Sequence, residues 1–119
     1  MKNVLIVDDS RTSRKVLRDI LERAGYTIVG EAVNGQEGFD EYMKLKPDIV
    51  TMDITMPVLD GIDSLKLIRE ADPNAKVVMI TAAGQKHKMM EAVKLGAAEF
   101  VAKPFVEETV IEALAHCEM

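Results

Sequence analysis

Short, continuous apolar runs alternate five times with longer segments in which apolar residues recur every three or four positions. The runs span residues 4–7, 27–32, 49–52, 76–80 and 99–102. Runs of this length are typical of strands that are buried on both faces of a sheet. Strands that alternate with helices imply a parallel sheet with right-handed crossovers and helices on both faces. The pattern therefore predicts an α/β chain of five βα units.

The intervening segments predict five helices, from Ser10 or Thr12 to about Ala24 and over about 36–46, 62–71, 86–95 and 106–116. An apolar stripe faces the core in each amphipathic helix. We expect it to consist of Val16, Leu17, Ile20, Leu21 and Ala24 in the first helix, Phe39, Tyr42 and Met43 in the second, Ile62, Leu65 and Ile68 in the third, and Val106, Val110, Ile111 and Leu114 in the last.

Five such units fit the flavodoxin-like, doubly wound strand order 2-1-3-4-5, in which the first and third strands are neighbours at the switch point. The order itself is not visible in the sequence. The less apolar run 99–102 is expected at an edge of the sheet.

Length and composition indicate one ordinary globular domain over residues 1–119, with 48% apolar and 29% charged residues. The formal net charge of −5 disfavours nucleic-acid binding, which needs clustered Lys and Arg. The single cysteine, Cys117, allows no disulfide within the chain, and no apolar run is long enough for a signal peptide or a membrane span. We therefore expect a cytoplasmic protein.

Charged residues close three of the predicted strands. Asp8 and Asp9 follow the first, Asp53 follows the third and Lys103 follows the fifth. The carboxyl ends of parallel strands lie at one edge of the sheet, where ligands bind. Three carboxylates repel one another unless a cation neutralises them, and a lysine beside them can hold an anion. These residues together predict a site for a divalent metal and a phosphoryl group.

Each of these residues also has a purely structural explanation. An aspartate after a strand can cap the following helix or complement its dipole. Asp53 can be a turn residue, although Pro57, Asp60 and Gly61 already serve the loop after it. The joint pattern favours chemistry: a carboxylate can attack phosphorus to give an acyl phosphate, and Mg²⁺ prefers hard oxygen ligands. Lys103 precedes a proline, so its backbone is expected to be extended and the bond between them can be cis.

A resemblance to a known family rests on motifs spread over about residues 2–116. These are Asp8-Asp9, Asp53 with Met56-Pro57 and Asp60-Gly61, Thr81-Ala82, and Lys103-Pro104-Phe105. Together they resemble the receiver domain of two-component response regulators, and most of all its stand-alone chemotaxis members.

The resemblance implies a role for each matching residue. Asp53 would be the phosphoacceptor and, with Asp9, a direct ligand of Mg²⁺. Asp8 would bind the metal through water, and the backbone carbonyl of Thr55 would be a further ligand. Mg²⁺ is thus the expected cofactor.

Thr81 and Lys103 would donate to the phosphoryl oxygens, and Phe100 would be the aromatic switch residue that turns inward as Thr81 moves. Many relatives have tyrosine in place of Phe100, so an output that uses a hydroxyl there is not implied. Thr55 and Ala83 occupy the positions that tune phosphoryl lifetime in the family. Neither offers a carboxylate or an amide to position water, so the resemblance predicts no lifetime.

The implied function is a phosphorylation-activated signalling switch rather than an enzyme, although the chain would assist its own phosphorylation and dephosphorylation. A chemotaxis-type histidine kinase would be the donor, and the output surface would be the fourth helix, fifth strand and fifth helix. The expected partner is the flagellar motor switch or another protein, with a phosphatase as a further partner and the chain itself a monomer. The alternative is a single-domain phosphorelay intermediate that passes the phosphoryl group to a histidine phosphotransfer protein.

Two further classes fit less well. Phosphatases of the haloacid-dehalogenase type need a second acid two residues after the nucleophilic aspartate, and that position is Thr55. A flavodoxin-like FMN carrier needs a phosphate loop rich in Ser, Thr and Gly after the first strand. The loop here begins Asp8-Asp9-Ser10-Arg11, and two carboxylates would repel the phosphate.

Overall fold

The computed structural model describes residues 2–118 and contains one five-stranded parallel sheet. Its strands are β1 (Asn3–Val7), β2 (Thr27–Ala32), β3 (Ile49–Asp53), β4 (Val77–Thr81) and β5 (Glu99–Ala102). The order across the sheet is β2-β1-β3-β4-β5, and each neighbouring pair is parallel. The predicted flavodoxin-like fold, the strand order and the edge position of β5 are confirmed.

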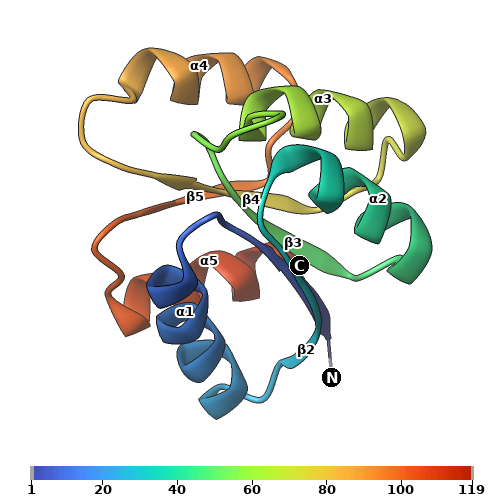
Figure 1. Cartoon of the computed structure of the whole chain (residues 1–119). Coiled ribbons are helices and arrows are strands. Elements are labelled where there is room, and N and C mark those ends of the chain that lie inside the picture. Colours follow the sequence, from blue (N-terminus) through green and yellow to red (C-terminus); the bar gives the residue numbers. More distant parts are fainter. Residues whose placement is uncertain (1, 119) are drawn as a thin grey trace.

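Five helices cover the two faces of this sheet. They are α1 (Arg11–Arg23), α2 (Gly35–Leu45), α3 (Gly61–Ala71), α4 (Lys86–Lys94) and α5 (Glu107–Cys117). Figure 1 shows α2, α3 and α4 on one face, with α1 and α5 on the other. Among residues 2–118, no helix has the length and apolar character needed to cross a lipid bilayer.

The side chains of β1 show why its residues are almost all apolar. Leu5 and Val7 pack into the cluster under α2, α3 and α4, whereas Val4 and Ile6 pack into the cluster under α1 and α5. All four are fully buried. Successive side chains of a strand point to opposite faces, and both faces here are covered. This burial fixes the strand end from which Asp8 emerges.

Four residues assigned to the helix stripes are exposed rather than buried. Val16 is 43% exposed, Met43 38% and Val106 58%, and Ala24 is also exposed. Val16 and Met43 lie at the margins of their stripes, where a period of 3.6 residues turns the side chain away from the sheet. Ala24 and Val106 are the C-cap of α1 and the N-cap of α5, so they lie outside the helices proper.

The start of α3 lies directly against the end of β3. The Gly61 N–H donates to the carbonyl of Ile54 at 2.7 Å. A Cβ atom at Gly61 would lie 1.9 Å from the backbone carbonyl oxygen of Asp53, so only glycine fits. This contact holds the backbone of Asp53 in place.

Candidate functional site

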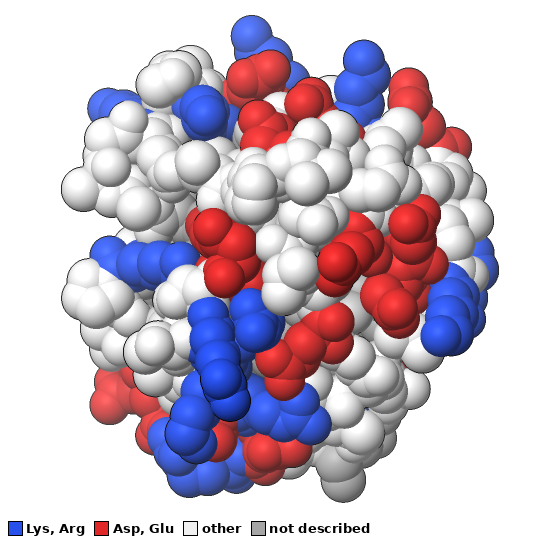
Figure 2. Space-filling view, in the orientation of Figure 1, with Lys and Arg blue, Asp and Glu red and all other residues white. Residues whose placement is uncertain are grey.

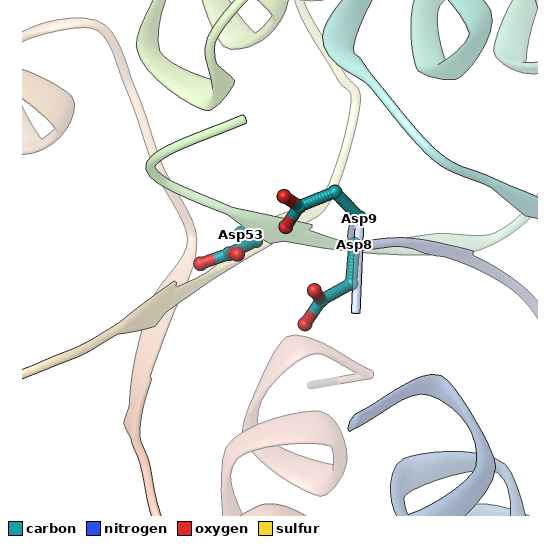
Figure 3. Close-up of side chains that lie close together, drawn as sticks. All are labelled: Asp8, Asp9 and Asp53. Atoms are coloured by element: carbon teal, nitrogen blue, oxygen red, sulfur yellow. The ribbon is translucent and has the colours of Figure 1, made fainter. Parts of the chain in front are cut away.

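Three aspartates meet at the carboxyl edge of the sheet, where β1 and β3 end side by side (Figure 3). Asp8, Asp9 and Asp53 each offer one carboxylate oxygen, and these oxygens all lie within 4.8 Å of one another. Asp8 is 3% exposed and Asp53 is 7% exposed, whereas Asp9 is exposed. The predicted acidic cluster therefore exists, with two buried members and one that faces solvent.

Both carboxylate oxygens of Asp8 are held by donors of the protein. Oδ1 accepts the backbone N–H of Ser10 at 2.8 Å, and Oδ2 lies 3.0 Å from Nζ of Lys103. The N-cap of α1 is Ser10, whose side chain accepts from the backbone N–H of Ser13 at 3.2 Å. Neither aspartate is thus the helix cap that the structural explanation required.

Lys103 enters the cluster from the end of β5. Its Nζ lies 3.0 Å from Oδ2 of Asp8 and 3.5 Å from Oδ2 of Asp53, and its side chain is 23% exposed. The bond between Lys103 and Pro104 is cis. Burial alone would lower the pKa of the ammonium, but the hydrogen bond to Asp8 and the charges of Asp53 and Asp8 together raise it. Lys103 is therefore a fixed positive charge inside the acidic cluster.

Asp53 has an unusual protonation equilibrium for a carboxyl group. Burial is the main cause that raises its pKa from 3.8 to about 6, and the charge of Asp8 and, more weakly, that of Asp9 act in the same direction. Lys103 opposes them without cancelling them. Ionised Asp53 is therefore unfavourable at neutral pH unless a further positive charge binds beside it.

The cluster fits a hard divalent cation on the chemistry of its donors. One ammonium among three carboxylates leaves an excess of negative charge, and the available ligand atoms are oxygens. Mg²⁺ takes one or two carboxylates and retains several waters. Asp9 and Asp53 suit direct ligation, and Asp8, whose oxygens already accept from Ser10 and Lys103, suits contact through water.

Thr81 and Thr55 lie on the strand end and the loop next to Asp53. Thr81 ends β4, is 7% exposed, and accepts the backbone N–H of Lys103 at its carbonyl, 2.7 Å away. Thr55 lies two residues after Asp53, and its hydroxyl accepts from Nε2 of Gln85 at 2.7 Å. Thus the strand ends that carry Asp8, Asp53, Thr81 and Lys103 converge, as predicted.

Gln85 was missed by the sequence reasoning. It follows no strand directly, and it occupies the N-cap position of α4 without making a side-chain cap bond. Its side chain reaches Thr55, which lies 30 residues earlier in the chain. The only available signal was a polar residue after Gly84 at the start of a predicted helix, which indicates a cap rather than a site residue.

Phe100 lies away from the carboxylates, on the edge strand β5. It is half-buried and packs against the cluster under α2, α3 and α4. It also lines a groove of about 480 Å³ between β5 and α5, together with Glu99, Glu112 and His116. The His116 ring pairs with the Glu99 carboxylate beside this groove. The predicted output surface therefore carries a concave feature.

Acidic side chains form a band across the face shown in Figure 2, and basic side chains gather below it. Around α1, Arg14 and Arg18 both pair with Glu31, so part of this basic character is neutralised. The acidic band agrees with the negative net charge of the chain.

A comparison with protein families matches residues 4–115 to the "Response regulator receiver domain" model. The "Chemotaxis protein CheY" of Thermotoga maritima is 53% identical over 113 residues, covering 95% of this chain and 94% of the relative. The protein of the same name from Listeria monocytogenes is 45% identical over 114 residues, with 96% of each chain covered.

Solved structures show the same similarity. A crystal structure of a complex of CheX, CheY, BeF3 and Mg²⁺ from Borrelia burgdorferi contains a chain with a TM-score of 0.94 and 38% identity, covering 99% of this chain and 90% of that one. The response regulator domain of Thermotoga maritima CheB has a TM-score of 0.87 and 35% identity, with 99% and 94% covered.

Proposed function

The chain belongs to the response regulator receiver domain family, and from this premise we propose that it accepts a phosphoryl group from a histidine kinase on Asp53. It is a CheY-like signalling protein of a two-component system. The finer assignment to Asp53 is supported by one observation above all: a buried carboxyl group lies against two other carboxylates and a fixed ammonium.

The proposed transfer forms a bond between a carboxylate oxygen of Asp53 and phosphorus, as the bond between phosphorus and the donor's histidine nitrogen breaks. Asp9, Asp53 and the backbone carbonyl of Thr55 would hold Mg²⁺ directly, and Asp8 through water. When bound, Mg²⁺ supplies positive charge to the carboxylates and the phosphoryl oxygens.

Lys103 and Thr81 would receive the new phosphoryl group. Lys103 already lies 3.5 Å from Asp53, so its ammonium needs only a small displacement to donate to a phosphoryl oxygen. Thr81 ends the strand next to β3 and would turn its hydroxyl to another oxygen. Through the same contacts the chain would assist its own phosphorylation and the later hydrolysis of the phosphoryl group from Asp53.

Phosphorylation would then change the surface made by α4, β5 and α5. Phe100 lines the groove on this surface and follows Glu99 on the strand paired with β4. Movement of Thr81 is expected to let Phe100 turn inward and so alter the groove. Population shift requires that contacts differ between the two states, and the phosphoryl oxygens provide that difference.

The partners are proposed from the relatives. Several are chemotaxis proteins, which supports a chemotaxis-type kinase and the flagellar motor switch as donor and target. The Borrelia burgdorferi relative forms a complex with CheX, so a CheX-like protein or a phosphatase is a further candidate. We also propose a cytoplasmic monomer that acts as one receiver domain over residues 1–119. The phosphorelay alternative stays a prediction.

Incubation with acetyl phosphate and Mg²⁺, followed by intact mass measurement, tests the phosphoacceptor. We expect one added phosphoryl group per chain, lost when the metal is chelated and lost in Asp53→Asn. Asp40→Asn, which changes an exposed aspartate on α2, is the matched control and should be labelled like wild type. Equal labelling of Asp53→Asn would overturn the assignment.

Transmission can be tested with beryllofluoride as a phosphoryl mimic. Amide spectra of the wild type should shift around Phe100 and along α4, whereas Thr81→Ala should bind the mimic without these remote shifts. Mg²⁺ binding should be retained, because a hydroxyl aimed at the phosphoryl group is not a metal ligand. Identical remote shifts in Thr81→Ala would show that Thr81 does not couple the site to the surface.

A further inference from the structure

The side chain of Gln85 joins two loops at the rim of the proposed phosphorylation site. Its Oε1 accepts the backbone N–H of Ala82 at 2.7 Å, and its Nε2 donates to the hydroxyl oxygen of Thr55 at 2.7 Å. Ala82 directly follows Thr81, and Thr55 lies two residues after Asp53. One carboxamide therefore connects the end of β4 with the loop after β3.

The orientation of this carboxamide follows from its partners. A backbone N–H can only donate, so the oxygen of the amide must face Ala82 and its NH₂ group must face Thr55. Both distances are short for hydrogen bonds of this kind. Thr55 and Ala83 have no carboxamide, but Gln85 at the start of α4 brings one next to Thr55. Its oxygen and its NH₂ group are both already hydrogen-bonded.

The segment held by Gln85 has little else to fix it. Ala82, Ala83 and Gly84 are all exposed, and Gly84 has a φ of +83°. Within α4, all of which the structure describes, only Ala92 is buried. Segments with few buried contacts open at low free energy. Two hydrogen bonds from one side chain can therefore carry much of the local order.

We propose that Gln85 is a positioning residue that holds the switch in its unphosphorylated arrangement. Its carboxamide ties Ala82 to Thr55 and so opposes the displacement of Thr81 toward Asp53. This inference rests on the proposed function, because it concerns the regulation of that same site. Movement of Thr81 carries Ala82 with it and strains or breaks the bonds to Gln85, so these contacts differ between the two states.

Loss of the tie should make the phosphorylated arrangement easier to reach. We expect Gln85→Ala to bind beryllofluoride, in the presence of Mg²⁺, about threefold to tenfold more tightly than wild type, since one net hydrogen bond corresponds to a change of this size. Thr55→Val removes the hydroxyl but keeps the backbone carbonyl. It should also tighten beryllofluoride binding. In the Gln85→Ala background it should cause no further increase in affinity, because both substitutions break the same connection between Ala82 and Thr55.

A second readout uses the unmodified protein without any phosphoryl mimic. The amide proton of Ala82 should exchange with solvent several-fold faster in Gln85→Ala, since its acceptor is gone. Gln36→Ala is the matched control: Gln36 is exposed on α2, and its side chain donates to Asp40 of the same helix at 3.0 Å. It should leave both the exchange rate and the affinity unchanged.

The two readouts separate this inference from the proposed function. If wild type fails to bind beryllofluoride at Asp53, the proposed function is wrong, and the exchange of Ala82 still decides whether Gln85 holds the loop. If wild type binds the mimic but Gln85→Ala behaves like Gln36→Ala, or binds it more weakly, Gln85 does not restrain the switch.

Discussion

Replacement of Asp53 by asparagine should stabilise the protein when no metal is present. Asparagine has the shape of the protonated acid but carries no charge. Burial and the charges of Asp8 and Asp9 raise the pKa of Asp53 from 3.8 to about 6 in the folded chain. At about 1.4 kcal/mol for each tenfold change in an equilibrium, this rise corresponds to about 3 kcal/mol of lost stability once Asp53 is ionised in both states.

The sign of the pH dependence follows from which state binds the proton first. As the pH falls through about 6, folded Asp53 takes up a proton before the unfolded chain does, so the wild type gains stability down to about pH 4. As the pH rises through the same range, that stability is lost. Asp53→Asn lacks this proton, so its advantage should be up to about 3 kcal/mol near pH 8 and should shrink towards pH 4.

Urea denaturation in the presence of a chelator, at a series of pH values, measures this difference directly. The other titrating groups are common to both proteins, so they largely cancel. Added Mg²⁺ should stabilise wild type more than Asp53→Asn and narrow the gap, because it binds the ionised cluster. An asparagine variant that is no more stable than wild type near pH 8, or an advantage independent of pH, would refute the electrostatic reasoning.

Four other substitutions test the site and the core by denaturation. Asp9→Ala should weaken Mg²⁺ binding and yet raise stability without metal, since a charge that repels Asp53 is gone; lower stability with normal Mg²⁺ affinity would contradict this. Gly61→Ala should lower the free energy of unfolding by at least about 2 kcal/mol, because the added Cβ would overlap the carbonyl of Asp53. An unchanged denaturation midpoint would disprove this close approach. Thr51→Val should raise the free energy of unfolding by about 1 kcal/mol, because the buried Thr51 hydroxyl has no hydrogen-bond partner among the described residues. Ser64→Ala should lower it, because the Ser64 hydroxyl donates to the Gly35 carbonyl. A Thr51→Val protein less stable than Ser64→Ala would contradict this difference between the two hydroxyls.

The convergence of Asp8 and Lys103 was predictable although 95 positions separate them, because each directly follows a predicted strand of the same parallel sheet. Parallel strands bring their carboxyl ends to one edge, whatever lies between them. The apolar runs were equally informative, since β1, β3 and β4 are covered on both faces and show no alternation with polar residues.

The contacts of Gln85 could not be predicted in the same way. They depend on the path of two loops, and loop paths follow from turns and packing rather than from a periodic pattern. The exposure of Val16 and Val106 has a related cause. A helical period defines the centre of an apolar stripe well, but the margin and the ends depend on how the helix lies on the sheet.

The residue that carries the phosphoryl group, proposed to be Asp53, can be identified by its chemistry. Reduction with borohydride converts an aspartyl phosphate to homoserine and leaves phosphohistidine and phosphoserine unreduced, so the modified residue can be located by peptide mapping after labelling with acetyl phosphate and Mg²⁺. Phosphorylation of Asp53 predicts homoserine at position 53, and at neither position 8 nor position 9. Homoserine at position 8 or 9, or a labelled chain that yields no homoserine, would contradict it.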